Sequence, residues 1–154
     1  MRKNNKILSQ NSVFELAYNL RKQGKVIGFT HGEFDLFNIS HLDLLKKSKE
    51  LCDFLIVGID SDLSIKKQKR NLQPIINEKS RVDIIKSLGF VNAVFIKDAY
   101  YQPCDEAKDL YKEINPNFIT IGQSFANEDL IKSLISKTDI DLKKLNVFQM
   151  VITD

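Results

Sequence analysis

Short apolar runs alternate with amphipathic segments along the chain, and this alternation predicts its secondary structure. Five runs have the continuous hydrophobicity of strands buried on both faces of a sheet, at residues 25–30, 54–59, 93–96, 118–121 and 147–152. Helical spacing of apolar residues occurs at 12–23, 40–52, 77–88, 105–114 and 129–136, and a short helix follows the second run. Because strands and helices alternate with short connections, we expect an α/β fold with a Rossmann-like, doubly wound, five-stranded parallel sheet.

Capping signals indicate where the helices begin and end. The expected N-caps are Ser12, Ser40 and Asn77. An acidic residue follows each of the first two caps three positions later (Asp43 for the second), which is the spacing of a capping box. Gly24 lies where the first helix should end, because glycine adopts the left-handed conformation that terminates helices.

The length and composition of the chain fit a single domain. We expect one domain over residues 1–154, with residues 1–10 flexible or loosely packed. The two cysteines, Cys52 and Cys104, form neither a disulfide framework nor a paired metal-binding spacing, so we expect a reducing cytoplasm. No apolar run follows the basic N-terminus, and no stretch approaches the ~20 apolar residues of a membrane span. We therefore expect neither a secretory signal nor a membrane partner.

The charge distribution argues against nucleic acid as a partner and allows two interpretations of one basic segment. A net charge of +3 is too small to indicate nucleic-acid binding, and basic residues are not interleaved with aromatic ones. Basic residues gather at 66–70. This segment is either a solvated loop or an anion-binding loop whose lysines concentrate a polyphosphate near a site.

Residues 28–41 carry the features of a phosphate site. Gly32 follows the first apolar run, so backbone N–H groups there can approach an anion without interference from a side chain. The helix that begins near His41 points its unpaired N–H groups and its positive dipole end to the same place, and the His41 imidazole adds another donor. In a wound parallel sheet, ligands bind at this edge of the strands.

The same segment resembles a known family. Residues 32–41, Gly-Glu-Phe-Asp-Leu-Phe-Asn-Ile-Ser-His, resemble the GxFDxxHxGH signature of the cytidylyltransferase-like nucleotidyltransferases of the HxGH type. Residues 53–62, 69–81 and 115–122 resemble further stretches of the family in the same order. Within the family, the chain resembles the adenylyltransferase domain of ADP-heptose synthase and glycerol-3-phosphate cytidylyltransferase, and its leading helix is similar to that of the former.

The resemblance implies transfer of AMP or CMP from a nucleoside triphosphate to a phosphorylated sugar or alcohol, with release of pyrophosphate. It assigns catalytic roles to His41, Asn38 and Lys69. It implies a nucleotide site formed by Phe29, Thr30, Gly32, Glu33, Phe34, Ser40, Asp62, Arg81, Gly122, Gln123 and Ser124. It also implies a Mg²⁺ ion on the triphosphate, no metal site of the protein's own, and pairing as a homodimer. Asp35 is expected to fix the loop rather than to act as an acid or base.

Several departures from the family pattern keep a second interpretation open. Asn38 replaces a histidine, Ser40 and Gln73 replace a glycine and an arginine, and residues 123–124 replace a Gly/His-Asp pair. The chain ends at Asp154, before a final helix that the family pattern would place there. We therefore expect weak activity, and the alternative is a catalytically impaired nucleotide-binding paralogue with a regulatory or scaffolding role. The G-x-G-x-x-G fingerprint is absent after the first strand, which disfavours a redox or flavin module.

Structural alternatives also remain for the individual candidates. Asp62 is either a ligand of the nucleotide or the cap of the short helix. Lys69 and Arg81 either contact phosphate or carry ordinary solvated charge. His41 is either a phosphate ligand or an ordinary residue of a first helical turn. His31 is given no role.

Overall fold

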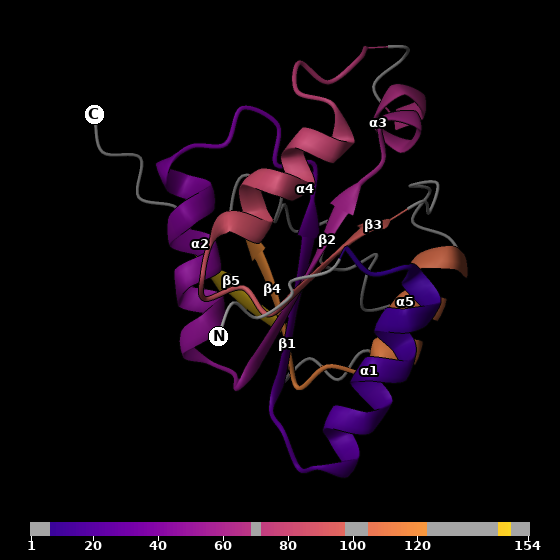
Figure 1. Ribbon diagram of the computed structural model, residues 1–154, viewed down its shortest axis with the longest axis vertical. Helices are drawn as coiled ribbons and strands as arrows, with labels where there is room; N and C mark the ends of the chain where they lie inside the picture. The colour runs from indigo at the N-terminus through magenta and orange to yellow at the C-terminus, as the bar shows by residue number, and fades with distance from the viewer. Residues whose placement is uncertain (1–6, 69–71, 98–104, 123–144, 149–154) are drawn as a thin grey trace.

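The fold is one parallel sheet covered by helices on both faces, as the computed structural model shows for residues 7–68, 72–97, 105–122 and 145–148 (Figure 1). The helices are α1 (Gln10–Lys22), α2 (Ile39–Glu50), α3 (Asp62–Gln68), α4 (Glu78–Ser87) and α5 (Asp105–Ile114). The strands are β1 (Ile27–Gly32), β2 (Phe54–Asp60), β3 (Ala93–Lys97), β4 (Phe118–Gly122) and β5 (Leu145–Phe148). The expected helix at 129–136 and the end of the last expected strand, 149–152, lie outside these residues.

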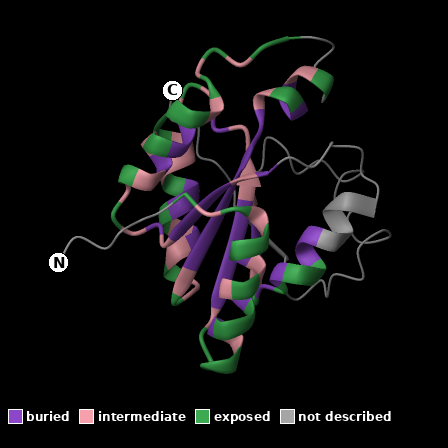
Figure 2. Ribbon diagram, turned by 45° about the vertical axis from the view of Figure 1, so that its right-hand side comes forward, coloured by how far each residue is buried: buried purple, intermediate pink, exposed green. Residues whose placement is uncertain are grey.

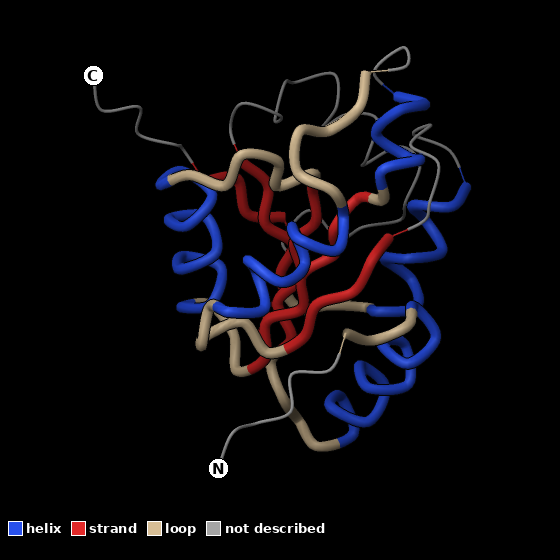
Figure 3. Tube along the Cα trace, turned by 45° about the horizontal axis from the view of Figure 1, so that its top comes forward, coloured by secondary structure: helices blue, strands red, loops and turns tan. Residues whose placement is uncertain are grey.

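The strand order places a topological switch beside β1. All strand pairs are parallel, in the order β3-β2-β1-β4-β5. The chain winds outward from β1 to β2 and β3, then returns to β4 on the other side of β1. Helices lie on either side of the strands (Figure 3). The parallel α/β fold predicted from the sequence is confirmed, and its switch point is where such sheets bind ligands.

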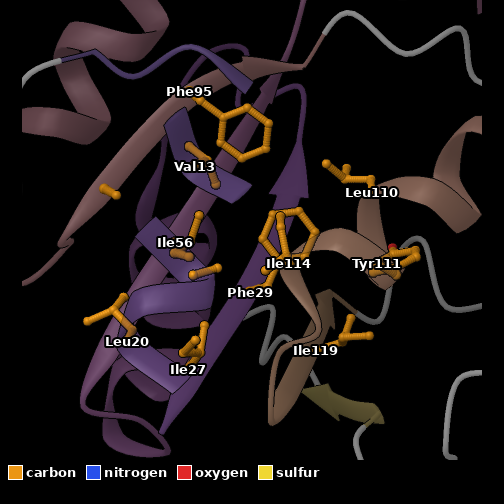
Figure 4. Close-up of a cluster of buried hydrophobic side chains, with 12 residues drawn as sticks. Val13, Leu20, Ile27, Phe29, Ile56, Phe95, Leu110, Tyr111, Ile114 and Ile119 are labelled. Atoms are coloured by element: carbon orange, nitrogen blue, oxygen red, sulfur yellow. The ribbon is translucent and has the colours of Figure 1, made fainter. Parts of the chain in front are cut away.

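Two apolar cores lie on opposite faces of the sheet. Strand side chains alternate between the faces, so Phe29 packs towards α1 and α5, whereas Val57 packs towards α2 and α4. Figure 4 shows the first core, in which Phe29, Phe95 and Tyr111 lie close to one another. The strands between the two helical layers are mostly buried (Figure 2). The sheet edge that carries the loops is thus held from both sides.

The helix boundaries differ from the capping predictions at two positions. Ser9 caps α1 and accepts from the N–H of Ser12, so the expected cap at Ser12 is wrong by three residues. Asn38 caps α2 instead of Ser40, because asparagine is as good an N-cap as serine and is the first such residue that the chain reaches. The predictions at Asn77 and Gly24 are confirmed: Asn77 caps α4, and Gly24 has a φ of +70° after the end of α1.

The described part of the chain contains no helix with the length and hydrophobicity needed to cross a membrane.

Candidate functional site

The loop between β1 and α2, residues 33–38, leaves the sheet at the switch point and is held in one conformation. Phe34 and Leu36 have φ values of +51° and +46°. Left-handed backbone is unfavourable for residues with a side chain and persists only where the surroundings enforce it. The Phe34 ring is buried in the core beneath α2 and α4 and supplies part of that constraint.

Asp35 joins this loop to the segment that precedes α4. Its carboxylate accepts from the backbone N–H groups of Ile75 and Ile76, at 2.8 and 2.9 Å, and from that of Leu36, at 3.1 Å. Desolvation alone would raise the pKa of Asp35, but the three hydrogen bonds and the charge of Arg81 together lower that pKa below its usual value of 3.8. The expectation that Asp35 fixes the loop is confirmed.

Arg81 is fully buried and bonds to three separate segments of the protein. Its Nη1 donates to the carbonyl of Glu33, and its Nε donates to the carbonyl of Ile76 at 2.9 Å. Its Nη2 forms an ion pair of 2.7 Å with Asp62. The guanidinium is therefore directed to acceptors within the protein, and the solvated-charge alternative for Arg81 is wrong.

The cap of α3 is Ser61, and not Asp62 as one alternative had it. The N-terminal turn of α3 is closed by Ser61, whose Oγ accepts from the N–H of Ser64 at 3.1 Å and whose carbonyl accepts from Ile65. Asp62 is the first helical residue and does not cap the helix. Its carboxylate is instead the partner of Arg81.

The first turn of α2 is closed by Asn38. The Asn38 Oδ1 accepts from the N–H groups of Ser40 and His41, at 3.0 and 3.4 Å, and its Nδ2 donates to the carbonyl of Leu36 at 3.3 Å. Both ends of the Asn38 amide are therefore used within the fold. The expectation that these two helix N–H groups are unpaired is wrong for this conformation, because the cap already satisfies them.

His41 is a predicted catalytic side chain with a donor left for a ligand. Its Nδ1 accepts from the backbone N–H of Asn38 at 3.2 Å, completing a capping box. Its ring lies between Phe34 and Phe37, with centroid separations of 5.5 and 5.6 Å. Partial burial lowers the pKa of His41 from 6.5. A neutral ring with Nδ1 as acceptor carries its proton on Nε2, which has no hydrogen-bond partner among the described residues.

The remaining predicted site residues divide by position. The ring of Phe29 is fully buried in the core, and its role as a nucleotide-binding residue stays a prediction. The hydroxyl of Thr30 is also buried and donates to the carbonyl of Thr120, so it joins β1 to β4. Gly32 and Gly122 end β1 and β4 at the same edge of the sheet. Lys69, Gln123 and Ser124 lie outside the described residues.

A second polar cluster, which sequence reasoning did not find, lies at the ends of β1, β2 and β3. Lys97 is 2% exposed, and its Nζ lies 2.9 Å from Oδ1 of the buried Asp60 and 3.2 Å from Nδ1 of His31. The His31 Nε2 lies 2.5 Å from the hydroxyl of Tyr111. We call these four residues the Lys97 cluster. The signal in the sequence is a charged residue directly after the apolar residues of both the second and the third run.

Burial and the neighbouring Lys97 together determine the protonation of His31. Burial, and then the positive charge of Lys97, lowers the pKa of His31 well below 6.5. An ammonium group can only donate, so Nδ1 of His31 accepts from Lys97 and Nε2 carries the proton. His31 therefore donates to Tyr111 and is neutral at physiological pH.

The described residues offer no metal site of their own. They contain no group of three or more His, Cys, Asp or Glu side chains that could hold a metal ion.

Comparisons with known proteins agree with this geometry. Residues 29–151 match the family described as cytidylyltransferase-like. The bifunctional protein HldE of Helicobacter pylori (strain ATCC 700392 / 26695) is 36% identical over 132 residues, which are 86% of this chain and 26% of that protein. HldE of Hyphomonas neptunium is 34% identical over 111 residues, 72% of this chain and 22% of that protein. The chain thus spans about a quarter of the length of these curated relatives.

Two solved structures share the fold. A lipopolysaccharide core biosynthesis protein from Thermoplasma volcanium superposes with a TM-score of 0.59 at 23% identity, covering 85% of this chain and 100% of that one. Pantoate-beta-alanine ligase from Francisella tularensis, solved with beta-gamma ATP and beta-alanine, superposes with a TM-score of 0.64 at 20% identity. That match covers 94% of this chain and 67% of that one.

Proposed function

Because the chain belongs to the cytidylyltransferase-like family, we propose that it transfers AMP or CMP from a nucleoside triphosphate to a phosphorylated sugar or alcohol, with release of pyrophosphate. The observation that carries the proposal is His41, whose Nε2–H donor lies at the start of α2, beside a strained and tightly held loop at the switch point of the sheet. The likeness to the adenylyltransferase domain of ADP-heptose synthase favours ATP and a sugar 1-phosphate.

The proposed reaction is an in-line displacement at the α-phosphorus. An oxygen of the acceptor phosphate forms a bond to that phosphorus, and the bond to the leaving pyrophosphate oxygen breaks. The acceptor oxygen is already ionised at neutral pH, so no general base is required. Catalysis then consists of holding the two phosphates in line and stabilising the charge that develops between them. The Nε2–H of His41 would donate to an oxygen of the α-phosphate or of the departing pyrophosphate.

Other residues of the site would position the reacting groups. The structure supports a positioning role for Arg81 and Asp35, because both hold the β1–α2 loop against the segment before α4 through bonds to the backbone. Gly32, Glu33 and the hydroxyl of Ser40 stay candidates for direct contact with phosphate. A Mg²⁺ ion bound to the triphosphate would neutralise part of its charge.

A second candidate function is a catalytically impaired nucleotide-binding protein. It is supported by Asn38, which replaces the first histidine of the family signature, caps the helix through its Oδ1 and bonds to the carbonyl of Leu36 through its Nδ2. A charged donor at that place would be absent. Hydrogen bonds to charged groups contribute about 1.5–3 kcal/mol, against about 1 kcal/mol for neutral pairs. A loss of this size slows a reaction by roughly ten- to a hundredfold and leaves binding possible.

One assay separates the two candidates. Pyrophosphate release is measured with ATP and with CTP, each against a panel of sugar 1-phosphates and alcohol phosphates, and nucleotide binding is measured in parallel by calorimetry. We expect turnover with one pair and at least a hundredfold slower turnover in His41→Ala, from the magnitude of losing one oxyanion donor. Binding without turnover of any pair would favour the second candidate. If neither nucleotide binds, both candidates are wrong.

A further inference from the structure

Two buried cations lie on opposite faces of the sheet at the ends of β1 and β2. Arg81 belongs to α4 and reaches this edge from the α2–α4 face. Lys97 ends β3, two residues after Phe95, so its side chain lies on the α1–α5 face with that ring. Their fractional exposures are 0% and 2%. Fully buried lysine and arginine are rare in proteins and need specific partners.

Each cation connects the same two strand ends. Arg81 bonds to the carbonyl of Glu33, directly after β1, and to the carboxylate of Asp62, shortly after β2. Lys97 bonds to His31, the second-last residue of β1, and contacts Asp60 at the end of β2. Together with the chain segments 31–33 and 60–62, these four contacts form a closed ring. It runs from Lys97 through His31 and Glu33 to Arg81, and back through Asp62 and Asp60.

The backbone of β3 strengthens this ring. Asp60 and Lys97 are paired directly across β2 and β3. The N–H of Ser61 also donates to the carbonyl of Lys97 at 3.1 Å. Side chain and main chain of Lys97 therefore hold the same turn, the one that presents Asp62 to Arg81.

The chain makes room for His31 at this position. Gly58 lies opposite His31 on β2, and a Cβ at residue 58 would lie 3.2 Å from both the Cβ of His31 and the Cζ of Phe95. A side chain at position 58 would therefore press against the Cβ of His31 and the ring of Phe95. His31 in turn donates to Tyr111 of α5, which connects the ring to the helix layer.

We propose that Lys97 and His31 are positioning residues for the β1–α2 loop. With Asp60 they hold the last residues of β1 against the end of β2, on the face opposite Arg81. The loop that begins at Glu33 is then fixed from both faces, and His41 keeps its place at the start of α2. The expected effect on nucleotide affinity rests on the proposed function, whereas the expected effect on the position of His41 does not.

The chain has two histidines, His31 and His41, so imidazole nitrogen NMR reads both ends of this connection. In the wild type we expect His31 as the neutral form protonated on Nε2. In Lys97→Met the donor to Nδ1 of His31 is lost, and we expect the resonances of both histidines to move. The dissociation constant of the nucleotide that the wild type binds, ATP or CTP, should rise at least about tenfold, because small displacements of a site are costly.

Lys49→Met is the matched control. Lys49, which is partly buried, also bridges segments by donating to the carbonyl of Asp53 and to the side chain of Asn92, but it lies at the opposite end of the strands. We expect this variant to leave the His41 resonances and the nucleotide affinity unchanged. An equal effect in Lys49→Met and Lys97→Met would overturn the inference, and so would a folded Lys97→Met protein whose His41 resonances match the wild type.

A pair of variants at His31 tests the inference if Lys97→Met does not fold. His31→Gln can still accept from Lys97 and donate to Tyr111, whereas His31→Leu can do neither. We expect the glutamine variant to keep His41 resonances and a nucleotide affinity close to those of the wild type. In the leucine variant we expect the His41 resonances to move and the nucleotide affinity to fall. Equal behaviour of the two variants would contradict the inference. If the wild type binds neither nucleotide, the proposed function is wrong, and the His41 resonances alone decide the positioning role.

Discussion

Arg81 satisfies acceptors in three separate segments of the chain. Its partners are the carbonyls of Glu33 and Ile76 and the carboxylate of Asp62. A residue with this set of bonds acts on the site through the backbone that it holds. We therefore expect its replacement to act mainly by lowering the stability of the whole protein, and not by removing a direct contact with phosphate.

We predict that Arg81→Met lowers the free energy of unfolding by about 2–4 kcal/mol, because it leaves three partly buried acceptors without their donor. Urea denaturation at neutral pH measures the loss. Lys79→Met is the control, since Lys79 is exposed on the same helix, and we expect a change within about 0.5 kcal/mol there. A loss in Arg81→Met no larger than in the control would show that the three bonds contribute little.

Asp35 gives a prediction with a defined pH window. Its pKa in the folded state lies below 3.8, so between that pKa and 3.8 the unfolded state binds a proton that the folded state does not. The stability contributed by Asp35 is thus present above pH 3.8 and is lost as pH falls through the folded-state pKa. In Asp35→Asn one carboxylate oxygen becomes an N–H donor that faces backbone N–H groups, so the variant should be less stable at pH 7.

The measurement is urea denaturation of wild type and Asp35→Asn at several pH values from 7 down to the acid limit of the fold. We expect the difference in unfolding free energy to be constant at neutral pH and to shrink in acid. A difference that stays constant down to the lowest pH at which the protein folds would contradict a lowered pKa for Asp35.

At the scale of elements, the start of α2 combines two demands on one residue. Asn38 closes the helix by accepting from two N–H groups, and the same groups would otherwise face an anion bound at the loop. Helix stability and anion binding are therefore opposed at this position. Substitutions that change the cap should move the two properties in opposite directions.

We predict that Asn38→His lowers the unfolding free energy by about 1 kcal/mol, the usual cost of losing an N-cap, and tightens nucleotide binding. Asn38→Asp should keep the cap and weaken nucleotide binding, because it places a negative charge beside a polyanion. Thermal unfolding and calorimetric titration with ATP and CTP measure the two properties. A change of the same sign in both properties for Asn38→His would show that the cap and the anion do not share these N–H groups.

Elements of this fold were predictable to the extent that local signals decide them. The apolar run at 54–59 coincides almost fully with β2, because a strand covered on both faces has few alternatives. The cap of α2 was missed because Asn38 was interpreted through the family signature as a catalytic position. Local capping chemistry alone would have allowed either Asn38 or Ser40.

At the scale of the whole molecule, the parts of the site that sequence could not provide depend on tertiary packing. The sequence shows a charge at Arg81, but its acceptors come together only when β1, β2 and the segment before α4 meet. The Lys97 cluster depends on the register that pairs Asp60 with Lys97. Sheet order and register are properties of the assembled fold, whereas Gly32 and His41 were recognisable from their spacing.

We predict that the correct nucleotide stabilises the entire domain against unfolding. At a concentration one hundred times its dissociation constant, it should add about 2.7 kcal/mol to the unfolding free energy if it binds only the folded state. For a chain of this size that is a rise in Tm of roughly 5–10 °C. Thermal scans with ATP and CTP identify which nucleotide is bound, and His41→Gln should show a smaller rise at equal concentration. No rise with either nucleotide at millimolar concentration would contradict nucleotide binding.

Gly58 has a consequence for how this family member can change over evolutionary time. A Cβ at residue 58 would lie 3.2 Å from both the Cβ of His31 and the Cζ of Phe95, so a methyl group there requires these neighbours to shift by a few tenths of an ångström. Residues 58 and 95 should therefore covary: glycine at 58 where β3 carries a phenylalanine at 95, and alanine where it carries a smaller side chain. A lineage that first accepted alanine at 58 would have closed the route to an aromatic ring at position 95.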